Sequence, residues 1–222
     1  MRVGVFGSGG FAHELAWHLD DAEVQFSKEV YSKDFSINFL SEGEDLQENI
    51  NGYQVISERD FLLNAKGDTD FFAIAIGMTS KRQQLVQKSK DRALVPVSII
   101  SKFARIGYST SMGEGAILCP GVILMPGVTI GDYFQGHLNS YVAHDCVIGD
   151  FVTLLPGVIC SGRVEIQNNV TIGAGAVIKN GSQSKPLTIG EGATIGMGAI
   201  VTKDVPSHSV VVGNPAKVLK RT

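Results

Sequence analysis

His144 stands directly before Asp145 in the stretch NSYVAHDCVIGDF, residues 139–151, where few other side chains ionise. An imidazole ordinarily titrates at about pH 6.5, so a neutral histidine can accept a proton at physiological pH. A carboxylate on the other ring nitrogen would fix the tautomer and strengthen the base, as in hydrolase triads. The His–Asp pair suits a general base, but the same two residues also fit a structural histidine or a metal ligand. The surrounding sequence has to separate these three interpretations.

Apolar residues recur every six positions around this pair. Of the fourteen positions, twelve are aliphatic or Met, and the series runs Ile100, Ile106, Met112, Leu118, Leu124, Ile130, Gly136, Val142, Ile148, Leu154, Cys160, Ile166, Ile172 and Ile178. A period of six fits neither a helix nor one strand. It is typical of short strands joined by tight turns, whose apolar side chains stack inside a parallel β-helix. The series slips by one residue across KNGSQSKPLT, which predicts a loop leaving the prism. It resumes at Ile189, and the tail after Val201 leaves it.

The same period places the candidate base. Val142 is expected to point inward, so His144 lies two residues later, beside a corner of the prism. Because neighbouring residues of a strand point to opposite faces, contact between His144 and Asp145 requires a local bend. Cys146 and Cys160 fall on apolar positions and are interpreted as small buried side chains.

A metal site is the rival interpretation of His144. The γ-class carbonic anhydrases hold zinc with three histidines between β-helices, but here only His137 and His144 lie in the middle coils. Two histidines are too few for such a site without another ligand. The three cysteines have no CxxC spacing, which argues against a zinc site and a disulfide framework. We therefore expect no metal.

The first hundred residues have a different pattern. A short apolar strand, VGVF, runs through Gly7, Gly9 and Gly10 into an amphipathic helix, a turn whose backbone N–H groups can approach an anionic ligand. A second buried strand, FFAIAIG, is followed by a polar helix, and further strands are possible at INFL and GYQVIS. No clean strand ending in Asp or Glu follows near residue 30, which argues against a dinucleotide site. We predict an α/β domain over 1–95 and a β-helix over 96–222.

Composition excludes several classes of function. The chain has 222 residues and a formal net charge of −3, with both signs interspersed, which argues against nucleic-acid binding. No apolar stretch reaches the roughly 20 residues that span a bilayer, and the N-terminus lacks the apolar core of a secretory signal. We expect a soluble cytoplasmic protein.

The chain resembles a known family over nearly its whole length. The stretches VFGSGGFAHELA and FFAIAIGMTSKRQQL, the six-residue period and the ending VVGNPAKV are similar to the PglD/NeuD-like sugar acyltransferase family. The resemblance implies a Rossmann-like domain that binds a nucleotide-linked amino sugar. It also implies a left-handed β-helix that carries acetyl-CoA, and a homotrimer with the base at an interface.

The resemblance also implies roles for single residues. His144 would be the general base and Asp145 the group that tunes it. The sugar nucleotide would meet Gly9, Gly10, Phe11, Glu42 and Gly77, and acetyl-CoA would meet Thr153, Ala174 and Met197. Three positions depart from the family: Phe11 replaces a histidine, Ser41–Glu42 stands for an acidic pair, and Thr153 replaces a histidine of some members.

Four cations are weaker candidates for phosphate contacts. Arg82 could meet a phosphate or lie on a solvated helix face. Lys203, Lys217 and Lys220 could meet the phosphates of the cofactor or remain exposed.

The expected reaction is transfer of acetyl from acetyl-CoA to an amino group of a UDP-, dTDP- or GDP-linked 4-amino-4,6-dideoxy sugar. Three alternatives stay open at this point. A sugar O-acetyltransferase would use the same base, a longer acyl-CoA would need a wider channel, and a non-enzymatic β-helix scaffold would need neither His144 nor the glycine-rich turn.

Overall fold

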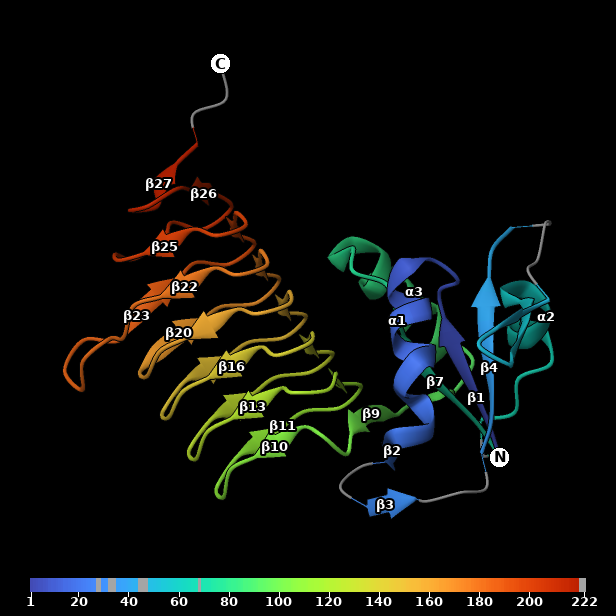
Figure 1. Ribbon diagram of the computed structural model, residues 1–222. Helices are drawn as coiled ribbons and strands as arrows, with labels where there is room; N and C mark the ends of the chain where they lie inside the picture. Colours follow the sequence, from blue (N-terminus) through green and yellow to red (C-terminus); the bar gives the residue numbers. More distant parts are fainter. Residues whose placement is uncertain (27–28, 32–34, 44–47, 68, 220–222) are drawn as a thin grey trace. The chain divides into compact units, whose positions relative to one another are not determined.

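The computed structural model describes residues 1–26, 29–31, 35–43, 48–67 and 69–219. The chain divides into two compact units, Met1–Ser101 and Lys102–Thr222 (Figure 1). The division falls after Ser101, a few residues beyond the boundary between residues 95 and 96 that we expected from the sequence. The last residues of the first unit, β9 (Ser98–Ser101), pair antiparallel with β2 (Ala22–Phe26), and β2 pairs with β3 (Glu29–Tyr31).

The first unit is built on a mostly parallel sheet. Its strand order is β5-β6-β4-β1-β7-β8, in which β5 alone among these described strands runs antiparallel to its neighbour. The strands are β1 (Arg2–Phe6), β4 (Ser36–Ser41), β5 (Asn49–Ile50), β6 (Tyr53–Ser57), β7 (Asp70–Ile74) and β8 (Val95–Pro96). The consecutive residues of β1 from Val3 to Phe6 are all buried, so both faces of this central strand are covered.

Helices connect the strands of this sheet. They are α1 (Gly10–His18), the 3-10 turn η1 (Leu19–Asp21), α2 (Glu58–Leu63) and α3 (Thr79–Lys90). The predicted strands at INFL and GYQVIS are present as β4 and β6. The strand that follows α1, β2, pairs with β9 rather than with β1. None of the described helices is long and apolar enough to cross a membrane.

The strand order leaves a crevice beside β1. The chain moves from β1 to β4 and β6 on one side, then crosses to β7 on the other side of β1. Loops from the carboxyl ends of β1 and β7 therefore lead apart, into α1 and α3. Such a switch point is where open α/β sheets bind ligands.

The second unit is a parallel β-helix of three sheets, whose coils are stacked from β10 to β27 in Figure 1. Arg105 pairs with Ile123 and Ile123 with Tyr141, so three six-residue repeats make one coil. The first sheet contains β10 (Arg105–Ile106), β13 (Ile123–Leu124), β16 (Tyr141–Val142), β19 (Ile159–Cys160), β22 (Val177–Ile178) and β25 (Ile200–Val201). The second contains β11 (Ser111–Met112), β14 (Thr129–Ile130), β17 (Val147–Ile148), β20 (Val164–Ile166) and β23 (Leu187–Ile189). The third contains β12 (Ile117–Leu118), β15 (Gln135–Gly136), β18 (Thr153–Leu154), β21 (Thr171–Ile172), β24 (Thr194–Ile195), β26 (Val210–Val212) and β27 (Lys217–Val218).

The apolar series forms the inner ladder of this β-helix. Its members from Leu118 to Ile178 are all buried, including Cys160. Ile106 is the exception, with 44% of its surface exposed, and Met112 is half-buried, because both belong to the first complete coil, at the end of the stack. Gly136 keeps the ladder packed, since the ring of Phe134 occupies the space its side chain would fill.

The predicted break in the period is a loop. Residues 179–186 connect β22 to β23, and the stacking resumes when Ile178 pairs with Val201 and Ile166 with Ile189. The tail leaves the six-residue period, as the sequence indicated, but it remains part of the β-helix. The tail completes another coil, through a parallel bridge between Ile189 and Val205 and the parallel pairing of β26 with β24, before β27 turns back antiparallel.

Asp70 anchors the start of β7 and gives a prediction for stability. Its buried carboxylate accepts hydrogen bonds from Arg2 Nε (2.9 Å) and the Lys66 backbone N–H (2.9 Å), and it pairs with Arg2 Nη2. The Arg2 hydrogen bond holds the pKa of Asp70 below its usual value. Because the folded pKa is depressed, this stabilisation is present above the unfolded pKa and is lost as pH falls through the folded pKa.

We expect Asp70→Asn to lower the free energy of unfolding by about 1–2 kcal/mol at pH 7, since Arg2 is partly hydrated. Urea titrations at pH 7 and pH 3 measure it. The difference in free energy of unfolding between the variant and the wild type should be smaller at pH 3 than at pH 7. An equal gap at both pH values would contradict the assigned role of the carboxylate.

Candidate active site

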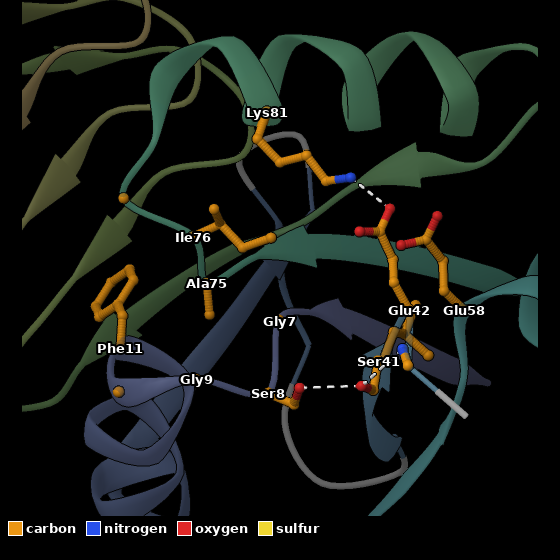
Figure 2. Close-up of a pocket in the computed structure, with 14 residues that line it drawn as sticks. Gly7, Ser8, Gly9, Phe11, Ser41, Glu42, Glu58, Ala75, Ile76 and Lys81 are labelled. Atoms are coloured by element: carbon orange, nitrogen blue, oxygen red, sulfur yellow. Dashed lines mark hydrogen bonds and ion pairs between the residues drawn. The ribbon is translucent and has the colours of Figure 1, made fainter. Parts of the chain in front are cut away.

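A cavity of about 410 Å³ lies at the carboxyl ends of β1, β4 and β7 (Figure 2). Its lining includes all five residues predicted to contact the sugar nucleotide, which are Gly9, Gly10, Phe11, Glu42 and Gly77. Gly9 caps α1 and Gly10 begins it, Glu42 follows β4, and Gly77 follows β7. The fold therefore brings together residues that are far apart in the sequence.

The fold does not require glycine at any of the three glycine positions among these residues. A methyl group added to Gly9, Gly10 or Gly77 would meet no other atom within 4 Å, and none of the three has a left-handed backbone angle. Neither packing nor backbone strain explains glycine at these positions. The space they leave is open toward the cavity, as a close approach of ligand to backbone requires. Gly7 is different, because its φ of +120° and the nearby Ala75 carbonyl do require glycine.

Charged groups lie at one side of the cavity. Figure 2 shows Phe11 on one side and the carboxylates of Glu42 and Glu58 on the other. Lys81, from the first turn of α3, pairs with Glu42 and is the only cation among the described residues that line the cavity. Glu58 is buried and accepts from Lys88 Nζ at 2.5 Å, and Ser8 Oγ donates to Ser41 Oγ at 3.1 Å.

Sequence reasoning did not single out Ser8, Glu58 or Lys81. Lys81 could have been found from its place beside Arg82, directly after the loop that contains Gly77. The start of α1 contributes a partial positive charge to the cavity, since α1 has no side-chain cap and no acid in its first turn. The cavity suits a ligand that carries both a negative group and hydrogen-bond donors.

Arg82 lies behind the cavity. It is 1% exposed, so the expectation of a solvated helix face was wrong, and it does not line the cavity. Its Nη1 donates to the backbone carbonyls of Gly77 (3.2 Å) and Ile76 (3.4 Å). Burial lowers the pKa of Arg82 to about 10, which leaves it charged at neutral pH. Its contacts fix the loop that contains Gly77.

His144 and Asp145 occupy the corner between β16 and β17. The imidazole Nδ1 lies 2.9 Å from Asp145 Oδ2, and both side chains are about half exposed. The required bend is present, because Asp145 has a left-handed φ of +59°. The hydrogen bond to His144 is the main reason that the pKa of Asp145 lies below its usual value, and the charge of Arg163 contributes to it. An exposed imidazole whose other nitrogen is held by a carboxylate has the arrangement of a general base.

The residues predicted for acetyl-CoA lie elsewhere on the β-helix. Ala174 is on the corner after β21 and Met197 on the corner after β24, and the N–H of Gly198 donates to the Ala174 carbonyl at 2.9 Å. Met197 is 80% exposed, whereas Thr153, on β18, is buried. His144 is on a different corner, so one chain does not bring the candidate base and Met197 together.

The remaining candidates are dispersed. Lys203 lines a cavity of about 590 Å³ with Lys179 and Lys185, Lys217 is exposed on β27, and Lys220 lies outside the described residues. His137, the other histidine of the middle coils, is buried, with 5% of its surface exposed. Within the described part of the chain, no three His, Cys, Asp or Glu side chains lie close enough together to hold a metal ion.

Comparison with known proteins gives near full-length matches. The chain is 38% identical over 219 residues to a GDP-perosamine N-acetyltransferase of Escherichia coli O157:H7, which covers 99% of this chain and 96% of that protein. The structure of WeeI from Acinetobacter baumannii AYE has a TM-score of 0.88 and 40% identity, covering 99% of this chain and all of that one. No protein-family model matches the chain.

A further structure bears on the cofactor. The acetyltransferase domain of PglB from Neisseria gonorrhoeae FA1090, solved in complex with acetyl coenzyme A, has a TM-score of 0.85 and 26% identity over 98% of each chain. The likeness extends through both units of the present structure, the parallel sheet and the β-helix together.

Proposed function

This chain belongs to the PglD/NeuD-like sugar acyltransferases, acetyl-CoA-dependent N-acetyltransferases of nucleotide-linked amino sugars, and we propose that its own substrate is a GDP-linked 4-amino-4,6-dideoxy sugar. The relative from Escherichia coli is named for N-acetylation of GDP-perosamine. The name of this near full-length relative favours N-acetylation over two alternatives that the sequence left open, sugar O-acetylation and a non-enzymatic scaffold.

The observation that carries the proposal is the cavity beside β1. It has open glycines at the start of α1, one lysine from α3 and a carboxylate after β4. A diphosphate would accept hydrogen bonds from the backbone N–H groups of Gly9 and Gly10 at the helix start. Phe11 offers a ring for stacking where the family resemblance implies a histidine. The buried guanidinium of Arg82 would hold the Gly77 loop against the ligand.

Glu42 is suited to recognise the nucleotide base of the substrate. The Watson–Crick edge of guanine presents two adjacent donors, the N1–H and the exocyclic N2–H₂, and a carboxylate can accept from both. Uracil and thymine present one N–H between two carbonyl oxygens, which a carboxylate repels. Glu42 is exposed at the cavity and forms an ion pair with Lys81. This chemistry favours GDP over UDP and dTDP.

We expect Glu42→Gln to raise the KM for a GDP-linked substrate about 10- to 100-fold, because one charge-assisted hydrogen bond contributes about 1.5–3 kcal/mol. Preference over the UDP-linked sugar should fall by a similar factor. Steady-state kinetics with both nucleotide sugars measures the two ratios.

Lys81→Gln is the matched control for this variant, since it breaks the same ion pair from the other side. It should weaken the binding of all nucleotide sugars by a similar factor and keep the preference for the GDP-linked sugar. Loss of base preference in Lys81→Gln as well as Glu42→Gln would mean that Glu42 only orients Lys81.

His144 is proposed as the general base at the acetyl group. Its neutral imidazole accepts a proton from the sugar amine as the N–C bond forms, and Asp145 stabilises the resulting imidazolium. A backbone N–H stabilises the oxyanion of the tetrahedral intermediate, and the proton then passes to the departing CoA sulfur as the C–S bond breaks. No acyl-enzyme is proposed on Cys146 or Cys160, because both thiols are fully buried.

A complete site is proposed between copies in a homotrimer. His144 and the cofactor residues Ala174 and Met197 lie on different corners of one β-helix, so a neighbouring copy would bring them together. Apolar side chains that face outward from the sheet of β13, β16 and β19, such as Ile123 and Ile159, are suited to an interface.

Three finer assignments complete the proposal. A Rossmann-like identity of the first unit is supported by the parallel order β6-β4-β1-β7 and the glycine-rich turn after β1. A left-handed coil is supported by the six-residue repeat, three of which make one coil. A cytoplasmic location is supported by the substrates, since acetyl-CoA and nucleotide sugars are intracellular metabolites.

The test is a panel of GDP-, UDP- and dTDP-linked 4-amino-4,6-dideoxy sugars with acetyl-CoA. Free CoA is followed with a thiol reagent and the products by mass. Turnover of the GDP-linked sugar at the highest kcat/KM, with a mass increase of one acetyl group, supports the proposal. Faster turnover of a UDP- or dTDP-linked sugar would overturn the assignment of guanine as the nucleotide base.

A further inference from the structure

Three contacts from the next coil meet the His144–Asp145 corner. The backbone N–H of Arg163 donates to the carbonyl oxygen of His144 at 3.1 Å. Arg163 Nη2 lies 3.5 Å from Asp145 Oδ2, the oxygen that also faces the imidazole. A methyl group on Gly162 would lie 2.9 Å from both Cε1 and Nε2 of His144. All three contacts come from two consecutive residues, Gly162 and Arg163.

We propose that Gly162 and Arg163 are positioning residues for the base: Gly162 leaves the space that the imidazole occupies, and Arg163 holds the Asp145 carboxylate. The proposal rests on the proposed role of His144. Neither residue touches the reacting atoms in this assignment. They act through the orientation and charge of the His144–Asp145 pair.

Gly162 is glycine because of the imidazole. It has no left-handed φ, so backbone strain does not explain it, and the nearest atoms to an added methyl group are two ring atoms of His144. The ring is thus held between the backbone of the coil above and the hydrogen bond that its Nδ1 donates to Asp145. On the coil below, Gly127 leaves room for the carboxylate, since a methyl group there would lie 3.1 Å from Asp145 Oδ1. The pair is enclosed from both sides.

Arg163 and His144 share one carboxylate. A carboxylate that also faces a guanidinium stabilises an imidazolium less than an unshared one does. Without Arg163, the Asp145 carboxylate would face the imidazole alone. The other ionisable group on this corner is Cys146, whose buried thiol donates to the Ser161 carbonyl at 3.2 Å. The coil below contributes Met125, Pro126 and Gly127, which do not ionise.

The first test is Arg163→Gln in the full-length enzyme. We expect kcat at pH 7 to fall about 3- to 10-fold, since the carboxylate loses a partner that fixes it. The acid limb of the kcat/KM profile should also move to higher pH by about half a unit, a size typical of a partly exposed pair. A merely structural role would lower the melting temperature without moving this limb.

Arg105→Gln is the matched control, because it removes the same charge from an exposed position on β10. Its pH profile should coincide with that of the wild type. An Arg163→Gln profile that also coincides with the wild type would overturn the role of Arg163.

The second test is Gly162→Ala, made in the wild type and in His144→Ala. In the wild type the imidazole must rotate away, so kcat should fall at least about 10-fold while the KM values for both substrates stay unchanged. In His144→Ala the added methyl group meets no ring and only the backbone carbonyl oxygen of residue 144, at 3.2 Å, so a much smaller further loss is expected. An equal loss in both backgrounds would overturn the role of Gly162.

The outcomes separate the two levels of inference. Wild-type activity in His144→Ala would contradict the proposed base, whatever the variants of Gly162 and Arg163 do. An inactive His144→Ala, together with Gly162→Ala and Arg163→Gln enzymes that match the wild type in kcat and pH profile, would overturn the positioning proposal alone.

Discussion

His144→Ala is expected to lower kcat about 10²- to 10⁴-fold, the range that a positioned general base contributes. The sugar amine would then have to lose its proton to water during attack on the thioester. The KM values for acetyl-CoA and for the nucleotide sugar should change little, because the imidazole acts on the proton rather than on either ligand's main contacts. Release of CoA, followed with a thiol reagent at saturating substrates, measures the loss.

The fold should survive this change. The His144 side chain is half exposed and lies on a corner outside the apolar ladder, so its removal opens no cavity in the core. His13→Ala is a suitable control, since His13 is an exposed histidine on α1 that does not line the cavity. A His144→Ala enzyme within 10-fold of the His13→Ala enzyme in kcat would mean that another group accepts the proton.

Gly10→Glu is expected to produce the largest loss of sugar-nucleotide binding. Gly10 is the first residue of α1, and a side chain there enters the open space of the cavity. A carboxylate about 5 Å from a diphosphate costs about 1–3 kcal/mol at protein-surface dielectric constants. Added to the lost space, this corresponds to an increase in KM of about 100-fold or more for the sugar nucleotide. The KM for acetyl-CoA should stay the same.

The charge can be separated from the volume with Gly10→Gln, which has the same shape as Gly10→Glu without the carboxylate. We expect Gly10→Gln to raise KM about 10-fold less than Gly10→Glu does. Both variants should melt no lower than the wild type, because a residue with a side chain is favoured over glycine in a helix and an acid suits its first turn. Equal KM values for Gly10→Glu and the wild type would place the diphosphate elsewhere.

The β-helix and the two candidate halves of the site were predictable from the sequence because their signals are local. The inner ladder repeats at a fixed interval, so each coil predicts the next, and Leu118 to Ile178 are buried as expected. The glycine-rich turn predicts a strand followed by a helix start, which the structure has at β1 and α1. His144–Asp145 is a pair of adjacent residues, and the bend that their contact requires is a single left-handed residue.

The sequence was a poor guide at positions whose burial or pairing depends on residues far away in the chain. Ile106 obeys the period but is exposed because its coil lies at the end of the stack. Arg82 has the composition of an exposed helix residue but donates to the carbonyls of the Gly77 loop. The tail loses the six-residue spacing, yet Val205 and β26 still pair with the preceding coil.

By itself, the sequence determined the repeat, the glycine-rich turn and the acid–base pair, since each depends on spacing within a few residues or on a constant period. Only the tertiary structure decided which distant residues share a site. The parallel order β4-β1-β7 brings Glu42, Gly9 and Lys81 to one cavity, and the coil length sets Gly162 and Arg163 against His144. The physical reason is that strand pairing converts separations along the chain into contacts, and such pairings leave little trace in the local pattern of residues.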